Sequence, residues 1–285
     1  MAFDDGIGVN ERTTRIALYQ ATTGIDPAAN AESIVDAIGK ASAGGARMLF
    51  TPEMSGLLDR DRSRAKGHIV RESDDPVLHR VRDAAKEHGI WVALGSLAVE
   101  REDGKWANRS LLIDADGQVA ARYDKIHMFD VDLATGESWR ESNAYVAGDR
   151  VVTVQSPLGR LGLAICYDLR FPALFEALGN ERCDAIALPA AFTVPTGKAH
   201  WETLIRARAI EASAYMIATA QVGTHEDGRQ TYGHSLVVDP WGEVLLDMGE
   251  VSGVGFADID PGRIEEVRRQ LPSLANRRKI PNSQP

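Results

Sequence analysis

One cysteine in this chain has surroundings that could make it a nucleophile. Cys166 follows the small apolar run LGLAI at 161–165, which is typical of a buried strand, and YDLRFP follows it at 167–172. Active sites of open α/β sheets lie at the carboxyl ends of the strands, which is where this run places the thiol. A free thiol has a pKa of about 8.5 and is mostly protonated at neutral pH, so it needs a base to become reactive.

Glu53 and Lys125 hold the same kind of position after other strand candidates, at 46–50 and 118–123. A carboxylate beside the thiol could accept its proton, and an ammonium beside both could stabilise an oxyanion. Each of these residues taken alone is more often structural, as a packed thiol or a solvated charge. Together they predict a thiol-based hydrolase. The other cysteine, Cys183, has no apolar run before it and is predicted to serve packing.

These three residues need a scaffold that brings distant strand ends together. Strand and helix patterns alternate, and no linker rich in proline, glycine or serine divides the chain, so we expect one α/β domain over 13–275. Residues 1–12 and 276–285 are expected to be tails. The element order divides into two loosely similar halves that meet near residue 150. If the strands before the three residues lie in one sheet, the side chains meet at one edge of it.

The apolar spacing gives the individual elements. Helices are predicted over 28–43, 76–88, 172–181, 200–213 and 261–271. Strands are predicted over 15–21, 46–50, 90–99, 108–113, 118–123, 151–155, 160–165, 185–188, 215–222, 234–239, 243–247 and 254–259. A long loop at 126–150 carries two acidic residues, Glu137 and Glu141, which sequence alone leaves as equal candidates for the site.

Composition excludes several classes of function. The net charge of −9 argues against a nucleic-acid partner, which usually requires a basic surface. The N-terminus lacks the apolar segment of a secretory signal, and no run is long enough to span a membrane. Two cysteines do not make a disulfide framework, so we expect a cytoplasmic protein. The seven histidines show no metal-binding spacing, the GxSxG pattern of serine hydrolases is incomplete at 233–237, and we expect neither metal nor cofactor.

Three segments resemble the motifs of the nitrilase superfamily of carbon–nitrogen hydrolases, over roughly residues 14–275. They are TPE at 51–53, YDKIHMFD at 123–130 and CYDLRFP at 166–172. The resemblance implies a four-layer α-β-β-α sandwich, usually dimerised by helix packing, in place of a simple doubly wound sheet. It also implies that Cys166 is the nucleophile and Glu53 the base, that Lys125 stabilises the oxyanion, and that Glu141 is the second glutamate.

Other segments are similar to one branch, the amidases that repair deaminated glutathione and the omega-amidases. They are TGKAHWE at 196–202, RARAIE at 206–211 and YGHSLVVDPWG at 232–242. This branch implies hydrolysis of a small carboxylate-bearing amide to acid and ammonia through a cysteine thioester. An N-carbamoyl amino-acid hydrolase, a nitrilase, an acyl transferase or a non-catalytic interaction protein of the same fold remain alternatives. Ala147 stands where these amidases often have proline, and segment 132–139 differs in detail and is a candidate for lining the pocket.

Residues near the nucleophile could bind the substrate. Arg170 follows Cys166 by four residues, and its guanidinium could hold a substrate carboxylate or pair with Asp168 or another acid. Two histidines near the motifs, His127 and His200, are predicted to be packed or hydrogen-bonded. The backbone N–H of Tyr167 is a candidate oxyanion donor. The other candidates for lining the substrate pocket are the Tyr167 side chain, Phe192, Thr193 and Thr196.

Overall fold

Two six-stranded sheets form the centre of the computed structural model, which describes residues 13–132, 136 and 138–281. The expected tail at 1–12, Glu137 and the end of the second tail lie outside the described residues. The first sheet has the order β16 (Gly253–Ile259), β1 (Thr14–Gln20), β2 (Met48–Phe50), β3 (Trp91–Glu100), β4 (Trp106–Ile113) and β5 (Val119–Asp124). The second has the order β15 (Val244–Asp247), β14 (Leu236–Val238), β11 (Tyr215–Ala220), β10 (Ala185–Ala190), β9 (Gly159–Leu163) and β8 (Thr153–Ser156).

The two sheets share one plan. Three neighbouring strands are parallel in each, β1-β2-β3 and β9-β10-β11, and every other strand pairs antiparallel with its neighbours. The last strand, β16, returns to the first sheet beside β1. Parallel strands of this kind need helical crossovers, and these helices cover the faces of the sheets.

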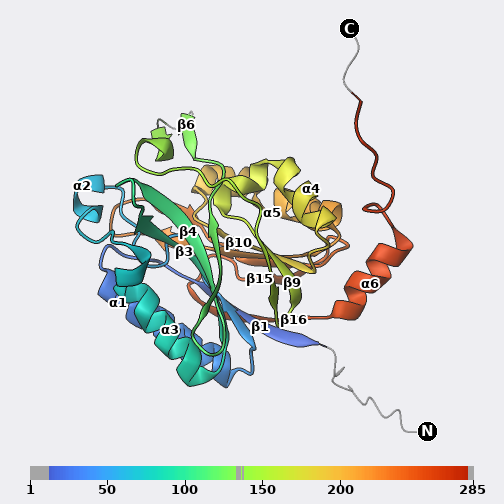
Figure 1. Ribbon diagram of the computed structural model, residues 1–285, viewed down its shortest axis with the longest axis horizontal. Coiled ribbons are helices and arrows are strands. Elements are labelled where there is room, and N and C mark those ends of the chain that lie inside the picture. Colours follow the sequence, from blue (N-terminus) through green and yellow to red (C-terminus); the bar gives the residue numbers. More distant parts are fainter. Residues whose placement is uncertain (1–12, 133–135, 137, 282–285) are drawn as a thin grey trace.

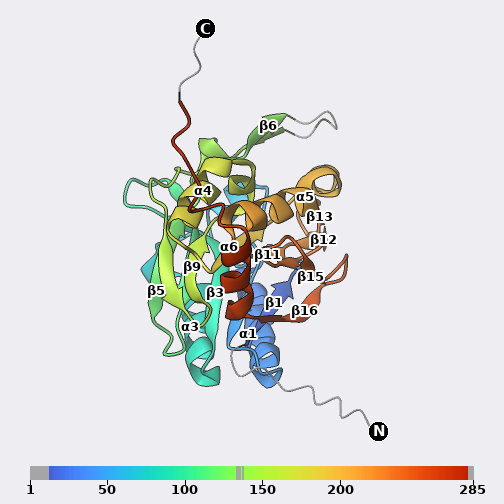
Figure 2. The same ribbon diagram turned by 90° about the vertical axis from the view of Figure 1, so that its right-hand side faces the viewer.

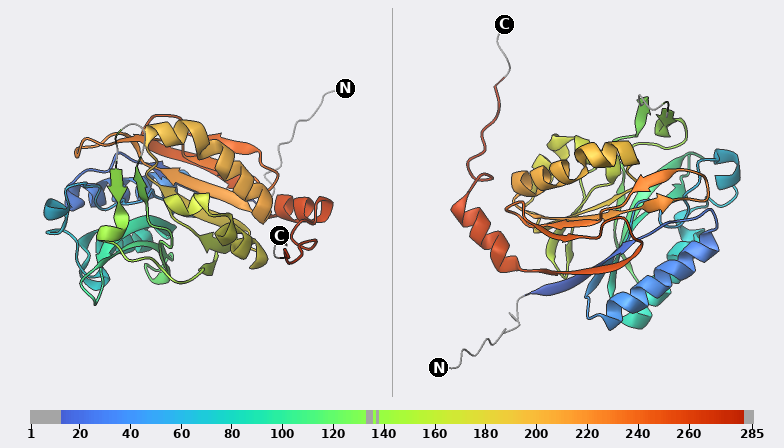
Figure 3. Two further views of the ribbon diagram at one scale, coloured as in Figure 1. Left: turned by 90° about the horizontal axis from the view of Figure 1, so that it is seen from above. Right: turned by 180° about the vertical axis from the view of Figure 1, so that it is seen from behind.

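Helices form the two outer layers. α1 (Pro27–Ala43) and α3 (Pro76–His88) contact the first sheet, and α5 (Val194–Ala212), beside α4 (Pro172–Asn180), contacts the second. Figure 1 shows α1 and α3 on one side of the paired sheets and α4 and α5 on the other, and the rear view in Figure 3 shows the same order. The four-layer α-β-β-α sandwich is therefore confirmed.

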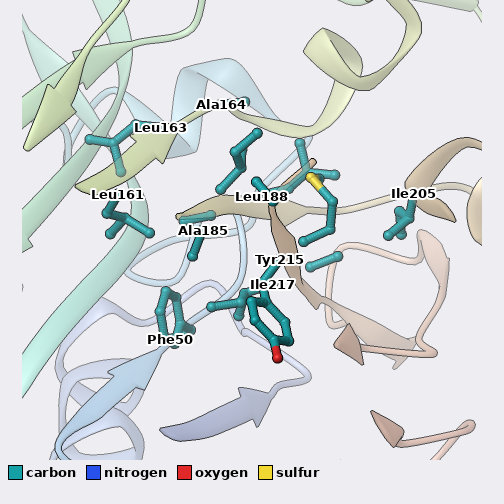
Figure 4. Packing of buried hydrophobic residues seen from close by; sticks show 14 of the residues in the cluster. Phe50, Leu161, Leu163, Ala164, Ala185, Leu188, Ile205, Tyr215 and Ile217 are labelled. Carbon is teal, nitrogen blue, oxygen red and sulfur yellow. The ribbon is translucent and has the colours of Figure 1, made fainter. Parts of the chain in front are cut away.

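Alternation along the strands explains why both faces of each sheet are buried. Ile16 and Leu18 of β1 join the cluster between the sheets, whereas Ala17 joins the cluster beneath α1 and α3. Successive side chains of a strand point to opposite faces, so an uninterrupted apolar run fills two cores. Figure 4 shows Phe50 of the first sheet among residues of the second, including Leu161 and Ile217.

The remaining elements are short, apart from the last helix. They are α2 (Arg62–Ala65), η1 (Glu72–Asp74), β6 (Asp130–Asp132), β7 (Ser138–Arg140), η2 (Glu141–Asn143), η3 (Cys166–Arg170), β12 (Val222–Thr224), β13 (Gln230–Tyr232) and α6 (Pro261–Gln270). Figure 1 shows α6 at one end of the sandwich, and in Figure 2 this end faces the viewer, with the residues after α6 extending upward. No helix in the described ranges combines the length and apolarity that crossing a bilayer requires.

Three predictions from the sequence are wrong. The three candidate residues do not follow strands of one sheet, because β2 and β5 lie in the first sheet and β9 in the second. The helix expected at 200 begins at Val194, since its second residue is a proline, which the first helical turn tolerates. Gly197 in that turn lies against Tyr232, and a Cβ there would come within 2.2 Å of the ring. The expected loop at 126–150 also contains the β6–β7 hairpin.

Candidate active site

Glu53 lies in a tight turn directly after β2. The backbone N–H of Thr51 donates to the carbonyl of Ala93 (3.1 Å), and the Thr51 hydroxyl accepts from the N–H of Gly95 (2.9 Å). A Cβ on Gly95 would lie 2.1 Å from the Thr51 carbonyl oxygen, so this close approach requires glycine. The turn and β3 therefore fix the depth at which Glu53 enters the site, where it is 5% exposed.

Lys125 follows β5, and neighbouring backbone holds it from both sides. Its N–H donates to the carbonyl of Asn108 on β4 (2.9 Å), and its own carbonyl accepts from the N–H of Gly148 (2.8 Å). A Cβ on Gly148 would lie 2.1 Å from the carbonyl oxygen of Asp124, so this position also requires glycine. The Lys125 side chain is almost fully buried.

Cys166 lies at the start of η3, just after β9, and its φ of +46° is unusual for a residue with a side chain. Asp168 holds this turn. Its Oδ2 accepts from the N–H of Ile165 (2.9 Å) and from the hydroxyl of Tyr123 (2.7 Å), and its Oδ1 accepts from the N–H of His127 (3.0 Å). Tyr123 belongs to β5, so one buried carboxylate ties the turn that carries Cys166 to the other sheet.

The catalytic candidates converge in spite of lying on two sheets. Lys125 Nζ lies 3.0 Å from Glu53 Oε1 and 2.9 Å from Glu141 Oε2. The Cys166 thiol interacts with the Glu53 carboxylate and with the Lys125 ammonium. All four side chains line one cavity of about 410 Å³. This arrangement sets an acid-base group and a cation beside a sulfur at the wall of a cavity.

Glu141 begins η2, in the segment that follows β7. Besides Lys125, its carboxylate accepts a hydrogen bond from the backbone N–H of Phe129 (2.7 Å). These contacts suit a role for Glu141 in orienting the lysine. The competing candidate from the sequence, Glu137, lies outside the described residues.

Asn108 of β4 is a part of the site that the sequence did not reveal. Its Nδ2 donates to Glu53 Oε1 (2.9 Å) and to Glu141 Oε1 (3.1 Å). Ionised carboxylates only accept hydrogen bonds, so the amide nitrogen must be the atom that faces them. The side chain is 2% exposed. The sequence offered one signal for Asn108, which is an amide side chain in a strand that is otherwise mostly apolar.

Replacing Asn108 with alanine is expected to lower kcat roughly 10- to 100-fold. The variant loses two hydrogen bonds to charged groups, each worth about 1.5–3 kcal/mol, and part of that loss appears as misplacement of Glu53. Steady-state kinetics with a thermal unfolding scan checks it. Asn276→Ala, at an exposed position, is the matched control. A wild-type kcat in Asn108→Ala would show that the two carboxylates keep their positions without the amide.

The charges of the site determine its protonation at rest. Burial alone would lower the pKa of Lys125, but Glu141 and Glu53 outweigh it and hold that pKa well above the ordinary value. Burial raises the pKa of the Cys166 thiol, the Glu53 carboxylate raises it further, and Lys125 opposes them only in part. The lysine is therefore an ammonium and the cysteine a thiol, so a base would have to accept the thiol proton for the sulfur to react.

Glu53→Gln is expected to lower the thiol pKa of Cys166. The substitution removes the negative charge that disfavours the thiolate, so thiolate appears at lower pH than in the wild type. Absorbance near 240 nm against pH, with the Cys166→Ala curve subtracted, follows this titration. Burial raises the pKa of Cys183 to about 12, and the subtraction removes its contribution. Glu87→Gln, an exposed substitution, should leave the curve unchanged, and an upward shift in Glu53→Gln would contradict the expected sign.

All five candidates for substrate binding line the cavity. The Arg170 guanidinium lies over the rings of Tyr167 (5.9 Å) and Phe192 (5.4 Å), and Nη1 contacts Nδ1 of His200 (3.3 Å). Its expected alternative, an ion pair with Asp168, is wrong, because that carboxylate is fully buried and bonded elsewhere. No described carboxylate pairs with this guanidinium.

Backbone donors complete the surroundings of the thiol. The N–H of Ala191, just after β10, donates to Glu53 Oε2 (3.0 Å) and also interacts with the Cys166 sulfur. The N–H of Tyr167 lies in the first turn of η3, where backbone donors lack partners within the helix. A backbone donor has no signature in the sequence, and only the fold revealed Ala191.

The residues expected to be structural are packed or hydrogen-bonded. His127 stacks on the ring of Phe171 at 3.6 Å and pairs with Asp168, and His200 contacts Arg170. Cys183 is fully buried in the apolar core, near Leu178 of α4, and both cysteines are free. Of the segment expected to line the pocket, Ser138 and Trp139 do so.

Comparisons with known proteins agree with this site and fold. The family model described as carbon-nitrogen hydrolase matches residues 15–269. The chain is 38% identical over 272 residues to a deaminated glutathione amidase of Yersinia enterocolitica, covering 94% of each chain. The crystal structure of the C. elegans NitFhit protein superposes with a TM-score of 0.86 at 36% identity, over 93% of this chain and 65% of that one.

A more distant solved structure shows chemistry at a cysteine. A mutant of the amidase from Nesterenkonia sp. AN1, described as showing Michael addition of acrylamide at the active site cysteine, has a TM-score of 0.77 and 27% identity. It covers 90% of this chain and 98% of its own. Together, the matched family model, the similarity over nearly the whole length and the shared sandwich show that the chain belongs to the carbon-nitrogen hydrolase family.

Proposed function

We propose that this chain is an amidase that hydrolyses a small carboxylate-bearing amide through a thioester on Cys166. The single observation that carries the proposal is the ion-paired group of Glu53, Lys125 and Glu141 against the thiol, inside one cavity. The family membership and the relatives named deaminated glutathione amidase support the same chemistry.

The first step is attack of the sulfur on the amide carbon. Glu53 accepts the thiol proton as the S–C bond forms, which the protonated resting state of Cys166 requires. The carbonyl oxygen becomes an oxyanion, and Lys125 with the backbone N–H of Tyr167 stabilises it. Glu141 and Asn108 hold Lys125 and Glu53 in place through the contacts described above.

Collapse of this intermediate breaks the C–N bond. Glu53 returns its proton to the departing nitrogen, which leaves as ammonia or an amine, and a thioester remains on Cys166. Water then attacks the thioester carbon while Glu53 accepts a proton from it. The acid departs, the proton returns to the sulfur, and the thiol is restored, so one carboxylate serves both halves of the reaction.

Deaminated glutathione is the proposed substrate, because curated relatives carry that name and Arg170 is free to bind a carboxylate. The test is a substrate panel of deaminated glutathione, alpha-ketoglutaramate, an N-carbamoyl amino acid and an aliphatic nitrile. We expect the highest kcat/KM for deaminated glutathione, together with a thioester adduct detectable on Cys166 by mass. Preference for the carbamoyl compound or the nitrile would assign the chain to another branch. A protein that forms no adduct with any of them would support the interaction-protein alternative.

We also propose a cytoplasmic homodimer. Two free, buried cysteines fit a reducing compartment.

The proposed dimer interface is an exposed apolar area on α5 and the turn after β14. Ile210 of α5 and Trp241 are large apolar residues that are exposed, and Ile210 packs beside Gly242, next to Trp241. They form a continuous apolar area that a second copy could cover. Sedimentation analysis should give twice the chain mass, and Trp241→Lys should shift it toward the monomer.

A further inference from the structure

We propose that the cavity holds a second anion-binding site, formed by Arg60, Arg229 and Trp139, which binds an anionic group of the substrate remote from Arg170. The inference rests on the proposed amidase function and adds the residues that hold the second carboxylate of the substrate. That carboxylate lies on the far side of the bond that is cleaved from the one at Arg170.

The second site is centred on one indole ring. Trp139 of β7 has the guanidinium of Arg229 over its ring at 5.1 Å and that of Arg60 at 5.9 Å. Arg229 belongs to the turn between β12 and β13, and Arg60 precedes α2, so three distant segments supply the site. All three side chains line the cavity. Guanidinium groups stacked on a ring are held in orientation while their N–H edges stay available.

Neighbouring acids leave these guanidinium groups free to bind an anion. Asp227 accepts from Arg229 Nε (2.7 Å), and no terminal nitrogen of Arg229 bonds to a described residue. Asp59 pairs with Arg64 through both oxygens, at 2.6 and 2.8 Å. Within the described ranges, Arg60 has no carboxylate partner at all. Guanidinium edges in this state can bind a carboxylate through two parallel hydrogen bonds.

A row of aromatic rings separates the two anion sites. Trp139 lies 6.4 Å from Phe129, which lies 5.1 Å from Tyr167, and Arg170 stands over Tyr167. The row offers a continuous aromatic wall along which a ligand that contacts both Arg170 and Arg229 can lie. The cavity of about 410 Å³ falls in the range of about 300–1,000 Å³ that holds drug-sized ligands, so it has room for such a molecule.

The surrounding charge favours the same class of ligand. The chain carries a net charge of −9, yet five arginines line this cavity. Two of the acids that line it, Glu53 and Glu141, are ion-paired with Lys125. Concentrated positive charge in the walls of a cavity raises the local concentration of anions. The five arginines are Arg60, Arg62, Arg140, Arg170 and Arg229.

The test compares matched substrates in matched variants. Deaminated glutathione has a carboxylate at each end, its glycine carboxamide derivative has lost the distal one, and alpha-ketoglutaramate has only one. We expect Arg60→Gln and Arg229→Gln to lower kcat/KM for deaminated glutathione roughly 10- to 100-fold, mainly through KM. Activity on the other two compounds should change less than about threefold. Arg170→Gln should lower kcat/KM for all three compounds.

Controls separate this inference from the function on which it rests. Arg229→Gln loses the ion pair with Asp227, which lowers the stability of the fold. Arg60 is exposed and pairs with no described carboxylate, so the kinetic effect of Arg60→Gln reports on binding and not on folding. Arg80→Gln, on the surface of α3, is the control for loss of charge. Calorimetry on Cys166→Ala measures binding of the same three compounds without turnover. Equal effects of Arg60→Gln on all three compounds, or no effect on any, overturn the second site. Cys166-dependent turnover of any of them still supports the amidase.

Discussion

Cys166→Ala is expected to abolish amide hydrolysis, with kcat lower by roughly 10⁴-fold or more, while the protein remains folded. None of the groups around the thiol can form a thioester in its place, because they are an acid, an ammonium and a backbone N–H. Alanine fits the position, since the side chain that it replaces is small and already among apolar neighbours. Ammonia or amine release from the substrate panel measures the loss.

Cys183→Ala is the matched control for the nucleophile. Cys183 is fully buried in the core and does not line the cavity, so its replacement should change stability and leave kcat close to wild type. Mass analysis of protein quenched during turnover should show the acyl adduct in Cys183→Ala and none in Cys166→Ala. Turnover that persists in a well-folded Cys166→Ala protein would refute the thioester mechanism.

Lys125→Met is the second change with a large expected effect, because it acts on both activity and stability. Without the ammonium, the Glu53 and Glu141 carboxylates face each other in a buried site with no cation between them. Breaking a buried ion pair by removing one partner costs about 3–5 kcal/mol. Loss of an oxyanion donor lowers kcat by about 10²- to 10³-fold. Denaturant unfolding and steady-state kinetics measure the two effects.

A double variant distinguishes these two consequences. Lys125→Met with Glu141→Gln removes one of the two opposed charges, so part of the lost stability should return while activity stays low. Lys86→Met, at an exposed position of α3, is the control for replacing a lysine by an apolar side chain. If Lys125→Met unfolds at the wild-type denaturant concentration, the two carboxylates do not depend on the ammonium, and the proposed electrostatic role is wrong.

The position of the site between the two sheets explains why its side chains are buried and held in fixed positions. Glu53 and Lys125 come from the ends of strands in one sheet and Cys166 from the other, so the reacting groups meet where the sandwich closes. Asp168 links the two sides through Tyr123 and the turn that carries the nucleophile. Burial there raises the thiol pKa and strengthens the attraction between Lys125 and its carboxylates.

Local sequence was sufficient to indicate the three residues that we propose as nucleophile, base and oxyanion-stabilising lysine. Each follows an apolar run, and the end of a strand is determined by neighbouring residues, so the signal lies within a few positions. The alternation of strands and helices indicated an α/β domain, and the resemblance to a known family supplied its four layers. The sequence patterns without the resemblance suggested a single sheet, because no local pattern indicates which of two sheets a strand will join.

Tertiary structure decided the contacts that act on those three residues. Glu53 meets the N–H of Ala191, 138 positions away, and Asn108 lies between two carboxylates from different segments. The pairing of Arg229 with Trp139 likewise depends on how two hairpins pack. The sequence determined which side chains could react, because residue type and strand ends are local properties. The packing of the two sheets and their connecting segments determined which groups touch, because those contacts join residues far apart in the chain.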